Sequence, residues 1–590
     1  MKIIFKSLPA TALWLIILVV PVSVVMYSCN KSFLKYSPQG SLNEAQIANN
    51  EGVNTLLIGV YGVLDGQGNG SAITGSSNWG STSPDNAIYG SGFGGEAHGV
   101  GPVSLVPTNG YLDDKWRADY EGITRANNVL KLVQLAKDMT DAQKANVIAQ
   151  AKCLRGHYYF DLKKMFNKVP WIDENTTDFY QPNTADIWPY IENDFLAAMN
   201  TLPETQPEPG RVNKWAAASY LAKAFLYQHK FDSAKTIFDQ VIANGKTTAG
   251  IKYGLFAEYE DNFRPEKELE SPQAVFPIEM SANVGNGTIS SGNQGDILYY
   301  PITAPFGCCG GYNPSLDLAN SFRTDPNGLP YLTDYNAHAL VSDLGIASAD
   351  PFTPDAGNLD PRVDWTAGRR ALPFLDWGLH AGASMVSFGQ PVTGPYNDKK
   401  LIFWQSTAKQ YYDANSWAPG SAINYLVIDF ADVLLMAAEC EAQLGNVDQA
   451  ETYVNQIRNR AANPAGWVYQ YLDNSNPIAG FSSTPAANYV ISPYPAGTFS
   501  AGGKQYALDA IYFERKLELS MEGHRFFDLV RWGIADQTLN AYYNYEKPLV
   551  QDLNVVPFVP GKNEYFPIPQ LQIDQSVVGG KKTLTQNPGY

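Results

Sequence analysis

The 590-residue chain has few charged residues, cysteines and histidines. Charged residues make up 17% of it, against roughly 25% in an average soluble domain. The net charge is −16, so the chain lacks the excess of Lys and Arg that neutralises phosphates, and nucleic acid is excluded as a partner class. The six histidines are scattered, with no HExxH motif and no pair at metal-ligand spacing.

Motifs for catalysis are also missing, since the chain has neither a GxSxG elbow nor a P-loop. Residues 90–95 formally fit GxGxxG, but they lie in a Gly-rich stretch without a flanking strand and helix. We therefore predict no catalytic residue, no cofactor and no metal. Two questions stay open: a carboxylate pair for glycoside hydrolysis, since there are 58 acidic residues, and a structural calcium ion.

The five cysteines do not form a disulfide scaffold. Cys153 and Cys440 fall in helical patterns and are predicted to be small apolar fillers. Cys308 and Cys309 are adjacent, and two free thiols or a strained vicinal disulfide are equally compatible with the sequence.

The N-terminus has the pattern of a secretory signal. Lys2 and Lys6 precede an apolar run at residues 13–26, and a small residue comes directly before Cys29. A cysteine at this place resembles a bacterial lipobox, which predicts a signal peptide at residues 1–28 and lipidation of Cys29. Several acyl chains on one residue give stable anchoring. An uncleaved anchor helix is the alternative, disfavoured by Pro21. No second long apolar run follows.

Helical periodicity dominates both ends of the chain, which predicts a mainly α fold. The amphipathic segments are residues 120–135, 142–165, 187–199, 214–244, 430–461 and 507–530. Two of them resemble each other, because Ala222, Asp232 and Ala234 recur at the same spacing as Ala438, Asp448 and Ala450. Small residues at a contact, a short turn and an Asp that can cap the next helix are typical of tetratricopeptide-like helix pairs. Such pairs need neighbours to bury their apolar faces.

Residues 66–110 and 247–421 have a different composition, rich in Gly, Pro, Asn, Ser and aromatic residues. They contain too many aromatic residues for disorder, so we predict long, ordered, irregular loops with minor β structure on one face of the helical scaffold. The whole chain has 35 Tyr and 12 Trp but little charge. This composition suits neutral polar partners such as carbohydrates.

Several separated blocks resemble the SusD/RagB family of nutrient-binding lipoproteins. The most specific is the segment at residues 511–533, IYFERKLELSMEGHRFFDLVRWG. Further blocks lie at residues 125–128, 151–160, 431–439, 566–569 and 584–590, in the family's order. The chain departs from the family at Asp429, where an Arg is usual, and it lacks an acidic cluster after Cys29. The Glu and Arg residues of the 511–533 block have helical spacing, which predicts structural salt bridges.

The resemblance implies a SusD-like fold, with residues 29–590 as one domain. Within it, residues 29–246 and 422–590 form the helical scaffold and residues 247–421 the loop-rich, ligand-facing region. It also implies a lipid-anchored protein of the outer membrane, exposed at the cell surface. Such a protein binds an oligosaccharide or polysaccharide and delivers it to a SusC-like TonB-dependent transporter.

We predict the ligand contacts in three loop clusters, where exposed aromatic rings meet the flat faces of sugars and polar groups meet their hydroxyls. Aromatic side chains serve this role at low entropic cost. The predicted residues are Trp79 with Asn78, Asp85 and Asn86, then Tyr299, Tyr300, Phe306 and Tyr312, and finally Trp365, Arg369 and Trp377. Two alternatives remain, an exported hydrolase acting on glycans and a tetratricopeptide-type scaffold that binds proteins.

Overall fold

The computed structural model describes residues 44–65, 87–89, 106–284, 300–301, 303, 305–307, 310, 312–386, 389–413, 420–550 and 557–590. Within these residues the chain is mainly helical, as predicted. The helices of the N-terminal half are α2 (Glu44–Ile47), α3 (Asn50–Tyr61), α6 (Gly110–Leu132), α7 (Asp141–Phe166), α8 (Trp188–Thr201), α9 (Lys214–Tyr227) and α10 (Phe231–Asn244). Those that follow are α11 (Leu316–Ser321), α12 (Val363–Thr366), α13 (Gln390–Thr393), α14 (Ala408–Tyr411), α15 (Phe430–Gln443), α16 (Val447–Ala461), α17 (Thr498–Glu518), α18 (Arg525–Trp532), α19 (Ala535–Glu546) and α20 (Gln570–Gln575).

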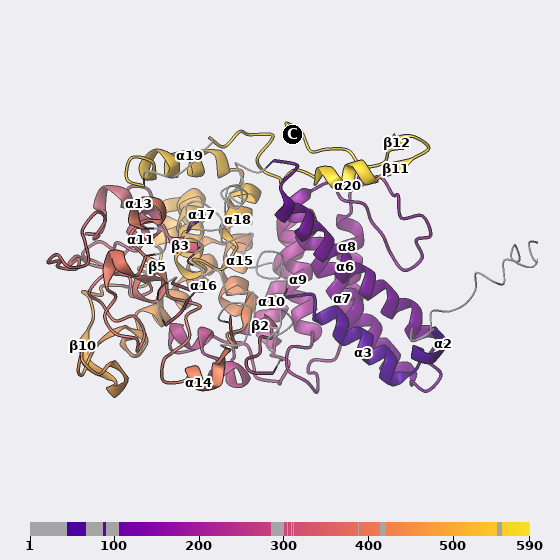
Figure 1. Cartoon of the computed structure of the whole chain (residues 1–590), viewed down its shortest axis with the longest axis horizontal. Helices are drawn as coiled ribbons and strands as arrows, with labels where there is room; N and C mark the ends of the chain where they lie inside the picture. Colours follow the sequence, from indigo (N-terminus) through magenta and orange to yellow (C-terminus); the bar gives the residue numbers. More distant parts are fainter. Residues whose placement is uncertain are drawn as a thin grey trace, which may run out of the picture.

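The long helices pack in the order of the chain. Helix α3 contacts α6, and the contacts continue from α6 through α7, α8 and α9 to α10. Helix α10 then packs on α15, which is far along the sequence, and α15 contacts α16 and α17. Figure 1 shows α3 and α6–α9 filling one side of the molecule, with the loop-rich segments on the other. The helix pairs therefore form one continuous scaffold, although a long segment interrupts them in sequence.

The two repeated segments form the helix pairs α9–α10 and α15–α16. Ala222 and Ala438 are fully buried where the helices meet, as their small size suggested. The predicted capping role of the aspartates is wrong, because Asp232 and Asp448 lie in the first turn of α10 and α16 rather than at the cap. Their carboxylates there face the positive end of the helix dipole, which favours negative charge without a capping bond.

Local sequence signals set several helix ends. Helix α7 begins with a capping box in which Thr140 and Gln143 bond each other's backbone. Asp429, the residue that departs from the family pattern, caps α15 by accepting a 2.6 Å hydrogen bond from the Asp432 amide. Cys153 and Cys440 are buried in the helical core and are free thiols, which confirms that they act as small fillers.

The strands are short and form six two-stranded antiparallel ladders within the described residues. They are β1 (Ala87–Tyr89), β2 (Ala274–Ile278), β3 (Tyr312–Pro314), β4 (Ala367–Gly368), β5 (Asn397–Asp398), β6 (Tyr412–Asp413), β7 (Gly420–Ser421), β8 (Tyr425–Asp429), β9 (Tyr469–Tyr471), β10 (Phe481–Pro485), β11 (Val577–Val578) and β12 (Lys581–Lys582). Their partners are β1–β3, β2–β8, β4–β5, β6–β7, β9–β10 and β11–β12. This is the minor β structure that the sequence predicted.

Two hydrophobic cores lie side by side. The first is formed by the packed helices, and the second lies under the loops of residues 259–423 and the 467–489 segment. Helix α17 contributes Leu508 and Ile511 to the first core and Phe513 and Leu517 to the second. The block at residues 511–533 therefore lies where the two cores meet.

The predicted salt bridges of this block are confirmed. Glu514 accepts contacts from Arg362 at 2.7 Å and from Arg458 at 3.0 Å. Glu518 pairs with Arg362 at 2.8 Å and also with Arg460. All of these side chains are buried. Ion pairs from the block at residues 511–533 therefore connect the helical core to the core under the loops. No helix within the described ranges is long and apolar enough to cross a membrane.

Candidate functional site

Short strands bring segments of the second and third predicted loop clusters together with the strand that follows the first cluster in sequence. Strand β1 begins directly after Asp85 and Asn86, and it pairs with β3, which contains Tyr312; the register places Tyr89 opposite Tyr312. Strand β3 in turn packs against β5, and β5 pairs with β4, which lies between Trp365 and Arg369. Segments far apart in sequence thus meet at one place.

A chain of neutral hydrogen bonds holds these strands. The Nδ2 of Asn397 donates to the Oδ1 of Asn313 at 3.4 Å, joining β5 to β3. The Nδ1 of His380 accepts a bond from the Gly382 amide, so its Nε2 donates to the Oδ1 of Asn397 at 2.8 Å. Burial lowers the pKa of His380 to about 4, and the ring is neutral at physiological pH. The side chains of Asn313, His380 and Asn397 therefore link the strands without an ion pair.

Under the strands lies a layer of aromatic rings. Phe306 packs edge-on against Phe374, Trp377 and Phe403, with ring centroids 5.0–6.0 Å apart. Tyr300 packs on Phe403 at 5.5 Å. Edge-to-face contacts at these distances stabilise packed aromatic clusters.

The expectation of exposed rings is wrong for most of the second and third clusters. Tyr300, Phe306 and Tyr312 have at most 1% of their surface exposed, because they close the second core from above. Trp365 is 8% exposed and donates from Nε1 to the Gly466 carbonyl at 2.8 Å. These rings support the loops from beneath and present no stacking surface to solvent.

Arg369 is also buried and already paired. It forms two 2.8 Å contacts with the two carboxylate oxygens of Asp364, and the Tyr489 hydroxyl donates to the same carboxylate. A guanidinium bound in this bidentate way has little left for a sugar hydroxyl. The prediction of Arg369 as a surface hydrogen-bond donor is therefore corrected to a structural ion pair.

Trp377 is the predicted residue whose ring remains half-exposed in the described part of the chain. Its Nε1 donates to the Phe403 carbonyl at 2.8 Å, which fixes the indole orientation. Asp376 beside it accepts bonds from the amides of Gln405 and Ser406. The turn that carries Trp377 is therefore rigid, and its ring has surface left for a contact.

Sequence reasoning missed Tyr412, which stacks on Phe403 with ring centroids 4.4 Å apart and stays half-exposed. Asn283 lies against it, donating from Nδ2 to the Tyr412 carbonyl at 3.2 Å and from its amide to Asp413 at 3.1 Å. The available signal was the Tyr411-Tyr412 pair preceding a polar loop. We name Trp377, Tyr412, Asn283 and the strands β1, β3, β4 and β5 the loop junction.

The remaining predicted residues lie outside the described residues. They are Asn78, Trp79, Asp85, Asn86 and Tyr299, together with Cys29 and the adjacent pair Cys308 and Cys309.

Comparison with known proteins identifies the family. The family model described as the SusD family matches residues 272–590, more than half of the chain. The chain belongs to the SusD family. A second family model, described as starch-binding and associating with the outer membrane, matches residues 32–226. The predicted family is thereby confirmed.

Relatives and solved structures agree with this family. SusD-like protein P25 of Formosa agariphila is 26% identical over 495 residues, which cover 81% of this chain and 80% of that protein. A SusD superfamily protein of Bacteroides vulgatus is 20% identical, with a TM-score of 0.63 and coverage of 93% and 99%. Surface glycan-binding protein A of Bacteroides thetaiotaomicron, solved with laminarihexaose, is 20% identical, with a TM-score of 0.62 and coverage of 91% and 99%. These structural likenesses confirm the predicted SusD-like fold.

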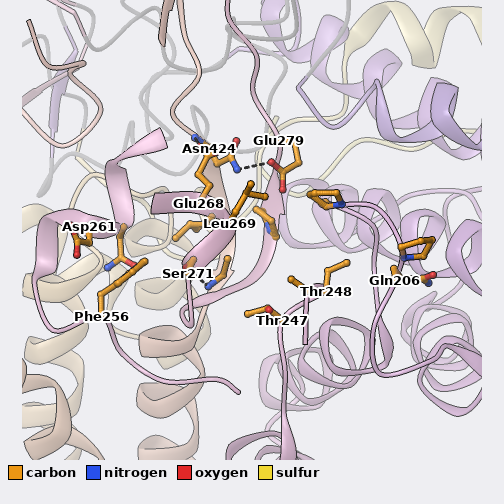
Figure 2. A pocket seen from close by; sticks show the side chains of 18 residues that line it. Gln206, Thr247, Thr248, Phe256, Asp261, Glu268, Leu269, Ser271, Glu279 and Asn424 are labelled. Carbon is orange, nitrogen blue, oxygen red and sulfur yellow. Dashed lines mark hydrogen bonds between the residues drawn. The ribbon is translucent and has the colours of Figure 1, made fainter. Parts of the chain in front are cut away.

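A separate pocket of about 180 Å³ lies between the strands β2 and β8 and the segments at residues 206–210 and 247–249. In Figure 2, Glu268, Leu269, Asn424 and Glu279 gather on one side of this pocket, across from Thr247 and Thr248. Asn424 donates from Nδ2 to Glu279 at 2.8 Å and from its amide to Glu268 at 3.2 Å. The pocket is thus acidic and holds one aromatic side chain, Phe256.

The three carboxylates of this pocket bear on the hydrolase alternative. Burial, and then the neighbouring Glu279, raise the pKa of Glu268 to about 9. Burial also raises the pKa values of Glu279 and Asp261. Glycoside hydrolysis needs one protonated and one ionised carboxyl group. These shifts favour a protonated Glu268 and do not by themselves assign an acid–base pair in this pocket.

One group of three carboxylates, Glu258, Glu260 and Asp261, is compact enough within the described residues to hold a metal ion. Two of them already face cations, since Arg264 lies 3.5 Å from Glu260 and Lys267 lies 4.0 Å from Asp261. These cations supply the charge that an ion would otherwise bring, so the group gives no support to a metal site.

Proposed function

We propose that this protein binds an oligosaccharide or polysaccharide at the loop junction without cleaving it. The observation that carries the proposal is the β1–β3–β5–β4 connection, because it joins segments of the second and third loop clusters to the strand that follows the first cluster in sequence. The half-buried rings of Trp377 and Tyr412, together with the neutral side chains of Asn313, His380 and Asn397, suit the apolar faces and hydroxyls of a neutral sugar. The laminarihexaose complex of surface glycan-binding protein A supports the ligand class.

The finer parts of the proposal concern the membrane. We propose that residues 1–28 are removed, that Cys29 is lipidated, and that the protein works at the outer membrane, exposed at the cell surface. The lipobox-like sequence and the family description that mentions the outer membrane support this. Residues 29–246 and 422–590 would then be the scaffold, with residues 247–421 facing the ligand. Substitution of Cys29 by Ala should abolish incorporation of radiolabelled palmitate in growing cells.

We further propose that the bound glycan passes to a SusC-like TonB-dependent transporter, as family membership implies. Affinity purification from detergent-solubilised outer membranes tests this step. The expected result is co-purification of one transporter of that class in near-equal amount. Purification of the protein alone from intact, gently solubilised membranes would contradict the proposed partner.

A binding panel separates glycan capture from the alternatives. Purified protein is run on native gels containing plant, host or microbial polysaccharides, and any hit is titrated by calorimetry and assayed for new reducing ends. Retardation without new reducing ends is expected. Released product would favour an exported hydrolase, and no retardation by any glycan together with captured proteins would favour a protein-binding scaffold.

A further inference from the structure

A second hollow, with a volume of about 520 Å³, opens on the side of the molecule formed by the N-terminal helices. Its walls come from α6, from the loop between α7 and α8, and from the C-terminal segment that carries α20 and the β11–β12 hairpin. Figure 1 shows α20 and this hairpin lying beside the ends of α6 and α8, away from the loops around β3 and β5. We call this hollow the C-terminal groove. Its volume is that of a site for a small molecule.

Hydrogen bonds connect the segments that form the groove. The Gln570 amide donates to the Pro107 carbonyl, and the Nε2 of Gln572 donates to Asp113 on α6 at 2.8 Å. On the other wall, Asn183 donates to the carbonyls of Lys168 and Thr585. Hydrogen bonds therefore join all three walls to one another, and the hollow is part of the folded structure.

Two aromatic rings of the groove face solvent. Phe179 is 67% exposed and Tyr180 is 50% exposed, side by side in the loop between α7 and α8. Asp178 holds their backbone, accepting a 3.0 Å bond from the Tyr180 amide at its carboxylate and one from Gln181 at its carbonyl. Large adjacent exposed rings at the mouth of a hollow mark an interaction site.

The rest of the lining combines apolar side chains, among them Trp116, Ile172 and Leu584, with polar ones, and its two charged residues have opposite signs. Amide and hydroxyl side chains come from Gln181, Gln572, Gln575, Ser576 and Thr583. Arg117 is offset by Asp113 and Asp114, at 3.6 and 3.8 Å, and Glu121 is offset by Arg125 at 2.7 Å. Both charged side chains of the lining are therefore already paired with residues of opposite charge, which does not favour a charged ligand.

One hydroxyl in the lining lacks a partner. The Oγ1 of Thr583 is buried and makes no hydrogen bond to the described part of the chain. A buried hydroxyl left unpaired costs free energy that a bound hydrogen-bonding group recovers. Because this oxygen has almost no accessible surface, the rings of Phe179 and Tyr180 are the part of the groove that a ligand meets first.

We propose that the C-terminal groove binds a short stretch of a neutral oligosaccharide, as a second site separate from the loop junction. Flat apolar faces and many hydroxyls are the features that exposed rings and neutral amides recognise together. A partner protein would be expected to cover a wider surface than one hollow. The two sites lie on different parts of the fold and can be disabled separately.

The test uses the mature protein labelled with 5-fluorotryptophan and followed by ¹⁹F NMR. Trp116 lies in the groove lining and reports on this site, while Trp79 reports on the loop cluster; both resonances are assigned with Trp→Phe variants. The probes are neutral hexasaccharides of several linkages, beginning with laminarihexaose. A saturable shift of the Trp116 resonance is expected for at least one probe.

Variants then locate that response. Phe179→Ala combined with Tyr180→Ala should weaken the Trp116 response at least about fivefold, and Tyr190→Ala is the matched control, since Tyr190 is 47% exposed but outside the groove lining.

The outcomes distinguish this inference from the proposed function. Loss of the Trp79 response with a retained Trp116 response would count against sugar binding at the loop junction and would support sugar binding in the groove. A silent Trp116 with every hexasaccharide would overturn the groove as a sugar site, as would an unchanged response in the Phe179/Tyr180 double variant. A Trp116 shift produced only by another protein would make the groove a docking surface and also overturn the inference.

Discussion

The helical body and the loop-rich region bury their side chains in different ways. The first core consists largely of aliphatic and small residues on regular helices, such as Ala222, Leu434 and Ala438, with aromatic rings such as Tyr158 and Phe195 packed among them. The second core is assembled from aromatic rings on irregular segments, with Phe403 in contact with Tyr300, Phe306, Trp377 and Tyr412. Loops without helical or sheet packing need large side chains to bury enough apolar surface. Aromatic residues in such loops therefore reflect packing as well as binding.

Ion pairs join the two regions where their cores meet. Arg362 comes from the loop-rich region, and its guanidinium contacts Glu514 and Glu518 of α17 as well as Asp360. Lys516 of the same helix reaches Asp317 at the other core. The two regions are thus held by buried charges in addition to apolar contact.

We expect the largest effect from a substitution that removes the ion pairs of Arg362. Arg362→Met leaves three carboxylates buried around a missing charge, so the free energy of unfolding should fall by about 3–5 kcal/mol in urea titrations. Lys582→Met is the control, because Lys582 and Asp574 form a 2.7 Å pair that is half-exposed. That variant should lose less than about 1 kcal/mol. Equal losses in both variants would show that the buried pairs do not hold the regions together.

The next prediction compares the two cores directly. Phe403→Ala should cost about 3 kcal/mol, because it removes the ring on which four others pack. Hydrogen exchange should then speed up in the segments at residues 300–314 and 365–413 more than in α7 and α9. Leu434→Ala, at a fully buried position of the first core, should instead increase exchange in the helices. Identical exchange patterns would mean that the two cores unfold as one.

A smaller effect concerns pH. Burial raises the pKa of Glu546 from 4.5 to about 8, and its carboxylate accepts a 2.7 Å bond from the Asp317 amide near α11. A folded-state pKa above the unfolded one gives stability that is present below pH 4.5 and lost as the pH rises through 8. Glu546→Gln should therefore match the wild type at pH 5 and exceed it by roughly 2 kcal/mol at pH 9. A variant less stable than the wild type at pH 9 would contradict the buried, protonated carboxyl group.

Sequence patterns predicted the helical body well. Periodicity located α6–α10 and α15–α18, since each long helix buries one face against its neighbour, and the repeated Ala and Asp spacing predicted the helix pairs. The turn between α9 and α10 carries no Gly or Pro; instead His229 adopts a φ of 57°, so the position of this helix boundary had no strong local signal. The turn between α15 and α16 has Gly445, with a φ of 92°.

For the loop-rich region, the sequence predicted the composition but not which side chains face solvent. Whether Phe306 or Tyr412 faces solvent depends on partners more than 60 residues away in sequence, such as Phe374 and Asn283. Arg369 likewise looked available until its bidentate contact with Asp364 was placed. Spacing within a loop does not show which of these contacts, near or far in sequence, a side chain makes. Asp429, by contrast, looked like a departure from the family and proves to be the cap of α15.

We propose that ligand capture depends on the loops and that stability depends on the cores beneath them. Trp79→Ala tests this most directly, with glycan affinity measured by calorimetry and melting temperature measured on the same sample. The account predicts at least about tenfold weaker binding of the best glycan from the panel, with a melting temperature within about 1 °C of the wild type. Unchanged affinity, or a weaker affinity that comes with a clearly lower melting temperature, would contradict it.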